Sequence, residues 1–127
     1  MRRQSKWAIE FNRQVKRLRE KSKRLWYKHP QPSLKKLKAT GQGNCLAWSH
    51  LSVEIAKMYG LKVRYITVWD RYKKDINTHQ ISLVYEKDGA IWYQSSIYIN
   101  RLYKPRGKEN FTTTKRRLCN AVAKDCG

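Results

Sequence analysis

Apolar side chains recur at three- and four-residue steps near the start of the chain. In the first 28 residues, one apolar row consists of Trp7, Phe11, Val15, Leu18 and Leu25. This spacing predicts an amphipathic helix, or two helices with a break near residues 21–23. Pro30 and Pro32 end the segment, because a residue before proline is disfavoured in helical geometry. Residues 34–38 then form a short basic connector.

A second helical pattern runs from Cys45 to Tyr59. Its apolar residues are Ala47, Trp48, Leu51, Ile55 and Met58. Asn44 is a good N-cap, and Gly60 suits the left-handed position that follows many helices. We therefore expect a helix that begins at Cys45 and packs one face on a core.

After Gly60 the pattern changes to one typical of strands. Residues 61–69, 78–86 and 90–98 are rich in β-branched and aromatic residues or alternate between apolar and polar. Residues 70–77 form a polar loop, and Asp88-Gly89 is a strong hairpin signal. We expect residues 78–98 to form an antiparallel hairpin.

The length of the hairpin turn decides which residues lie beside His79. If Asp88 and Gly89 are the two turn residues, Ile81 pairs with Ser96, and Gln94 and Ser96 share a face with His79. A three-residue turn shifts the register and brings Ser95 over instead. We favour the two-residue turn.

The C-terminal part is predicted to hold a basic loop at residues 100–110 and a last helix from Thr112 or Thr113 to about Lys124. We therefore predict one α+β domain over residues 1–127. It comprises a basic helical segment (1–38), a core (41–98) and a basic C-terminal loop and helix (100–127). The N-terminal helices and the Cys45 helix pack on a small antiparallel sheet.

Charge narrows the choice of partners. The chain has 29 Lys and Arg against 9 Asp and Glu, a formal net charge of +20. This excess favours a polyanion, either nucleic acid or an acidic protein surface. The residues that we expect to contact nucleic acid are Arg13, Lys16, Arg17, Arg19, Lys23, Arg24, Lys115, Arg116 and Arg117.

Three cysteines cannot all pair with one another, so we expect reduced thiols and a cytoplasmic location. No stretch is apolar enough to cross a membrane. The sequence has no Cys-x-x-Cys motif or comparable close pair of metal ligands, so we expect neither metal nor cofactor. The residues considered as ligands are Cys45, His50, His79, Cys119 and Cys126.

Cys45 has the setting of a reactive thiol. At the first position of a helix, the positive end of the helix dipole favours thiolate over thiol. Backbone N–H groups at the same end can hold an oxyanion. The alternative is a small core cysteine without chemistry, since most intracellular cysteines are of that kind.

The order of these features resembles the transglutaminase-like branch of the papain-like cysteine peptidases. The resemblance covers residues 41–98: a cysteine that opens a helix after a Gly- and Asn-rich turn, then a histidine at a strand start and a Trp-containing strand. It implies that Cys45 is the nucleophile and His79 its base. The family commonly has an Asp after the tryptophan, whereas here Gln94 or Ser96 would orient His79. Gln42 would help the backbone to hold the oxyanion.

The resemblance implies a cysteine hydrolase or acyltransferase that acts on a peptide or a glutamine amide. The alternative is a member of the fold that has lost catalysis and binds nucleic acid or an acidic protein through its basic faces. A small, very basic chain would also suit a bacteriophage, in which case the location is the host cytoplasm.

Overall fold

The computed structural model describes residues 5–22, 33–69 and 78–103. Outside these ranges lie residues 1–4 and 23–32 of the basic N-terminal segment, the predicted loop at 70–77, most of the predicted loop at 100–110 and the predicted C-terminal helix. The candidate nucleic-acid contacts outside them are Lys23, Arg24, Lys115, Arg116 and Arg117.

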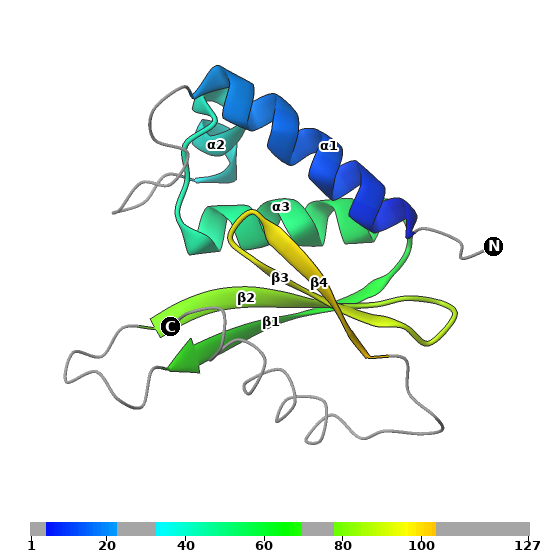
Figure 1. Cartoon of the computed structure of the whole chain (residues 1–127). Helices are drawn as coiled ribbons and strands as arrows, with labels where there is room; N and C mark the ends of the chain where they lie inside the picture. The colour runs from blue at the N-terminus through cyan, green and yellow to red at the C-terminus, as the bar shows by residue number, and fades with distance from the viewer. Residues whose placement is uncertain (1–4, 23–32, 70–77, 104–127) are drawn as a thin grey trace.

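Within the described part of the chain, three helices lie on one side of a four-stranded antiparallel sheet (Figure 1). The helices are α1 (Lys6–Lys21), α2 (Leu34–Thr40) and α3 (Cys45–Met58). The strands are β1 (Lys62–Trp69), β2 (Thr78–Tyr85), β3 (Ile91–Ser95) and β4 (Tyr98–Tyr103), in that order across the sheet. The predicted α+β class is confirmed.

Helix α1 follows the apolar row of the N-terminal segment. Its buried residues are Trp7, Ala8, Phe11, Val15 and Leu18. Ser5 caps the helix by accepting the Ala8 N–H at 3.1 Å. The indole Nε1 of Trp7 donates to the Ser52 carbonyl oxygen at 3.1 Å and so connects α1 to α3. The predicted first helix is confirmed, and it ends at Lys21.

Helix α2 occupies residues that were predicted to be only a connector. Ser33 caps it by accepting the Lys36 N–H at 3.3 Å, and Leu37 is fully buried. Gly41 follows with a φ of 76°. A Cβ atom at Gly41 would lie 2.1 Å from the Leu18 carbonyl oxygen, so only glycine lets the α2–α3 connection pass the end of α1.

Helix α3 begins at Cys45, as predicted, and lies between α1 and the sheet (Figure 1). Its buried residues are Ala47, Trp48, Ser49, Leu51, Ser52, Val53, Ile55 and Ala56. Gly60 follows with a φ of 68°, which confirms the predicted left-handed position after the helix. Because α3 is covered on two sides, polar side chains that face the sheet must find partners there.

The β2–β3 hairpin has the register that we considered second. Ser82 pairs with Gln94, and Tyr85 pairs with Ile91. The predicted two-residue turn was therefore wrong. The Glu86 N–H donates to the Ala90 carbonyl oxygen at 2.8 Å, which leaves a loop of residues 87–89 with Gly89 at a φ of 91°. A three-residue loop that ends in a left-handed glycine is the next most common hairpin connection.

The predicted strand 90–98 is two strands. β3 ends at Ser95, a turn follows at residues 96–97, and β4 occupies residues 98–103. The predicted loop was wrong for residues 100–103. Ser96 has a φ of 56°, and it is the one non-glycine residue with positive φ among those the structure describes. Only Ser95 and Ser96, which are weaker turn formers than Gly, Pro, Asn or Asp, mark this turn, so the sequence pattern did not locate it.

Candidate active site

Cys45 is the first residue of α3 and is partly buried. The Asn44 Oδ1 atom accepts the Ala47 N–H at 3.0 Å, which makes Asn44 the cap that the sequence predicted. The thiol therefore lies at the positive end of the helix dipole. The Leu46 N–H, next along the chain, has no carbonyl one turn earlier in the helix to accept it.

Cys45 shares a face of α3 with Ser49 and Ser52, which follow at helical spacing. The Ser52 and Ser82 Oγ atoms are 2.7 Å apart, and Ser49 Oγ donates to the Gln80 carbonyl oxygen at 3.2 Å. Ser49 is nearer than Ser52 to the start of α3, and its partner Gln80 is nearer than Ser82 to the start of β2. The starts of α3 and β2 therefore lie toward the same end of the sheet. Helix α3, which Cys45 opens, starts above the end of the sheet where β2 begins (Figure 1).

His79 is the second residue of β2, and its side chain contacts Ser95. The His79 Nε2 and Ser95 Oγ atoms are 2.8 Å apart. Ser95 ends β3 and is the residue that the three-residue turn was expected to bring over. The structure therefore holds one nitrogen of the imidazole with an uncharged hydroxyl.

The side chains of β2 alternate between the two faces of the sheet, which fixes the face on which His79 lies. Ser82 faces α3, and side chains alternate along a strand, so His79 is directed to the opposite face. Ser95 lies on that face too, since it bonds His79. The His79 imidazole is therefore directed to the face of the sheet opposite to α3, the helix that carries Cys45.

Gln94 and Ser96, the two predicted partners of His79, make other contacts. The Gln94 Oε1 atom accepts from Ser82 Oγ at 2.9 Å, and its Nε2 donates to the Ser96 carbonyl oxygen at 2.7 Å. Ser96 Oγ is buried and has no hydrogen-bond partner among the described residues. In the observed register Gln94 pairs with Ser82, which turns its side chain to the face opposite to His79.

Gln42, the predicted oxyanion residue, is bonded to the end of α1. Its Nε2 donates to Ser22 Oγ at 3.3 Å, and its backbone N–H donates to Thr40 Oγ1 at 3.2 Å. The side chain thus ties the turn before Cys45 to the preceding helix.

His50 is exposed and pairs with a tyrosine of β1. The His50 Nδ1 atom lies 2.8 Å from the Tyr65 hydroxyl, and the rings meet edge to face with centroids 5.4 Å apart. Burial raises the pKa of Tyr65 above its ordinary value.

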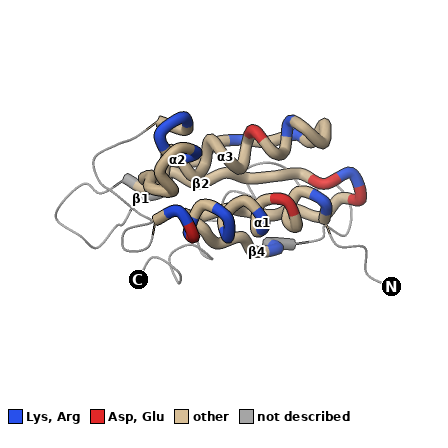
Figure 2. The backbone as a smooth tube through the Cα atoms, turned by 90° about the horizontal axis from the view of Figure 1, so that it is seen from above, with Lys and Arg blue, Asp and Glu red and all other residues tan. Residues whose placement is uncertain are grey.

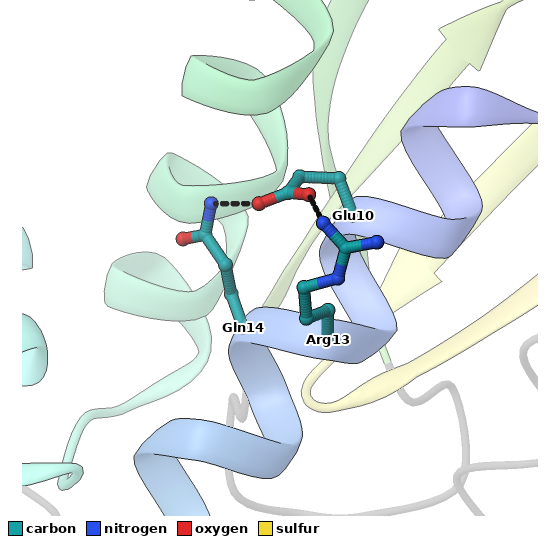
Figure 3. Close-up of polar contacts among 3 residues, drawn as sticks. All are labelled: Glu10, Arg13 and Gln14. Atoms are coloured by element: carbon teal, nitrogen blue, oxygen red, sulfur yellow. Dashed lines mark hydrogen bonds and ion pairs between the residues drawn. The ribbon is translucent and has the colours of Figure 1, made fainter.

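The described candidate contacts for nucleic acid lie on α1, where Arg13, Lys16, Arg17 and Arg19 are all exposed. Lys and Arg follow much of α1 and gather again at α2 (Figure 2). Glu10 bonds Arg13 at 3.0 Å and Gln14 at 3.1 Å (Figure 3). In the described ranges, no carboxylate forms an ion pair with Lys16 or Arg17.

Among the described residues, no helix combines the length and the apolar character needed to cross a membrane. Comparisons with curated proteins and with solved structures gave no match. The family model for the transglutaminase-like superfamily matches residues 5–122, a range that contains all three helices, all four strands, Cys45 and His79. Because this match covers far more than half of the chain, the protein belongs to the transglutaminase-like superfamily.

Proposed function

We propose that the protein is a thiol hydrolase or acyltransferase that acts on an amide carbonyl, either a peptide bond or a glutamine side chain. The observation that carries this proposal is the 2.8 Å contact between His79 Nε2 and Ser95 Oγ. A histidine held through one ring nitrogen presents the other in a fixed direction, as a general base requires. In this role Nε2 carries a proton and donates to Ser95, and Nδ1 is the basic atom.

The reaction begins when His79 Nδ1 takes the proton of Cys45 and Sγ attacks the carbonyl carbon. The carbonyl electrons move to oxygen, and N–H groups at the start of α3 stabilise the oxyanion. Collapse of this intermediate expels the amine, which takes the proton from His79 and leaves a thioester on Cys45. Water completes hydrolysis, and a primary amine completes acyl transfer.

Ser95 takes the position of the acidic residue that the sequence lacks. A hydroxyl can orient the imidazole but carries no charge to stabilise the imidazolium that forms during attack. Catalysis is therefore expected to be weaker than with a carboxylate at this position. Ser95→Asp should strengthen the base, and Ser95→Ala should weaken it.

Iodoacetamide alkylation of Cys45 against pH, followed by peptide mass, tests the pair directly. Cys119 and Cys126 are reference thiols in the same chain. We expect Cys45 to react faster below about pH 8 than an ordinary thiol. His79→Ala should slow alkylation at pH 7 about tenfold, Ser95→Ala should slow it less, and Ser95→Asp should speed it.

Turnover of a peptide or glutamine-amide substrate should be abolished by Cys45→Ala and by His79→Ala. Circular dichroism of each variant checks that the fold remains. An alkylation rate at Cys45 that matches the reference thiols and ignores His79 would rule out the proposed pair, since it would mean that the imidazole does not reach the thiol.

The second candidate is a fold kept for binding polyanions, and the exposed residues Lys16 and Arg17 favour it because neither has a carboxylate partner in the described ranges. Such a surface binds phosphate backbones through charge. Lys16→Gln with Arg17→Gln should lower the salt dependence of duplex binding by about two counterions.

Lys57→Gln with Lys62→Gln, at exposed positions outside α1, is the matched control for this pair. Duplex binding should survive Cys45→Ala. Affinity that does not change with salt, or equal effects of the two double variants, would exclude an α1 surface for nucleic acid.

A further inference from the structure

Among the described residues, the largest fully buried polar side chain is Gln94 of β3, which neighbours Ser95 in the chain. Gln94 has no exposed surface, and neither do Ser52 and Ser82. Ser82 Oγ donates to Gln94 Oε1, so its own oxygen must accept from Ser52 Oγ, 2.7 Å away. Gln94 Nε2 then donates to the Ser96 carbonyl oxygen. We name this series of contacts, from Ser52 to the Ser96 carbonyl, the buried polar chain.

The buried polar chain ends at a turn with unfavourable backbone geometry. Ser95 pairs with Tyr98, which leaves residues 96 and 97 as a two-residue turn. Ser96 has positive φ and Ile97 does not. A positive φ at the first turn residue alone is the pattern of a type II′ turn, where glycine is preferred. A serine there needs support from its surroundings.

We propose that Gln94 is a positioning residue for His79 and acts through this turn. By holding the Ser96 carbonyl at 2.7 Å, the amide fixes the peptide that follows Ser96. Ser95 immediately precedes this turn, and its Oγ holds His79 Nε2 at 2.8 Å. Gln94 therefore does not touch the imidazole but sets where its partner lies. This inference rests on the proposed function, in which His79 is the base. The hydrogen bonds from Gln94 to Ser96 and from His79 to Ser95 do not depend on activity.

The test is the exchange rate with water of the His79 ring N–H, measured by NMR. Gln94→Met keeps the volume and removes both hydrogen bonds. We expect it to raise the exchange rate about fivefold, because a hydrogen bond between His79 and Ser95 slows exchange and depends on the turn. Ser82→Ala also breaks the buried polar chain but leaves the bond from Gln94 to Ser96, so it should leave the exchange rate unchanged.

Ser96→Gly provides a rescue, since glycine adopts positive φ without support. In this background Gln94→Met should no longer change the exchange rate. The same comparison serves if Gln94→Met alone does not fold. The proposal is overturned if Gln94→Met leaves the exchange rate of the His79 ring N–H unchanged, or if Ser82→Ala changes it as much as Gln94→Met does. It is also overturned if Gln94→Met still raises the exchange rate in the Ser96→Gly background.

The NMR result does not depend on turnover. An inert Cys45 together with a Gln94-dependent His79 would reject the proposed function and keep this inference. An active Cys45 with a His79 indifferent to Gln94 would do the reverse.

Discussion

Helices α1 and α3 have similar lengths, 16 and 14 residues, but differ in how much of each is buried. α1 buries one apolar row and exposes a basic outer surface. α3 is covered by α1 on one side and by the sheet on the other, and two of its buried residues are serines. The outer surface of α1 can therefore change without loss of fold, whereas polar groups on α3 are fixed by their partners.

The largest expected effect is at the connection that holds the two helices together. Gly41→Ala places a Cβ atom 2.1 Å from the Leu18 carbonyl oxygen at the end of α1, at a φ of 76°. We expect a loss of about 3 kcal/mol in the free energy of unfolding, measured with urea. Gly60→Ala is the matched control, because its φ is 68° but nothing lies within 4 Å. It should cost only about 1 kcal/mol. Equal losses would mean that backbone strain, not the close approach to α1, explains Gly41.

The next largest effect is the loss of stability when the N-cap of a helix is removed, which should be greater for a buried cap than for an exposed one. Asn44 caps α3 and is 5% exposed, whereas Ser33 caps α2 and is exposed. Asn44→Ala should cost about 2 kcal/mol of unfolding free energy and Ser33→Ala about 0.5 kcal/mol, since water can replace the exposed cap. Urea denaturation measures both. A larger loss for Ser33→Ala would contradict the difference in burial between the two helices.

A small effect is expected on the outer surface of α1. Lys16→Gln with Arg17→Gln removes two exposed charges that lack ion-pair partners in the described ranges. Unfolding free energy should change by less than about 0.5 kcal/mol. A marked loss of stability would show that these side chains have a structural role and would weaken the contrast with α3.

The smallest effect is a pH dependence on the sheet. Burial raises the pKa of Tyr85, and the nearby Arg64 charge opposes this only in part. The folded state therefore holds the phenol proton more tightly than the unfolded state. This contribution is complete below the ordinary tyrosine pKa of about 10 and is lost as pH rises through the folded value.

Tyr85→Phe should flatten the fall of stability above about pH 10, measured by thermal unfolding at a series of pH values. Tyr98→Phe, at an exposed position, is the control. An unchanged slope in Tyr85→Phe would contradict the stated sign.

Helices α1 and α3 could be predicted from the sequence because the residues that specify each helix are close together in the chain. Apolar spacing in α1, the Asn44 cap and Gly60 each act within a few residues. The register of the β2–β3 hairpin, in contrast, does not depend on the turn residues alone. Asp88-Gly89 suits a two-residue turn, yet the pairing of β2 with β3 adds residue 87 to the loop. Because of that single shift, His79 contacts Ser95 and not Gln94 or Ser96.

By itself, the sequence determined the α+β class, the position of Cys45 at the start of a helix, the strand that carries His79 and the basic surface of α1. Only the tertiary structure decided which side chain holds His79, where β3 turns into β4, and that Gln94 is buried against Ser82. The physical reason is the separation along the chain between the residues that interact. Caps and helical periodicity depend on neighbouring residues, whereas strand register and buried hydrogen bonds depend on what the rest of the fold brings beside them.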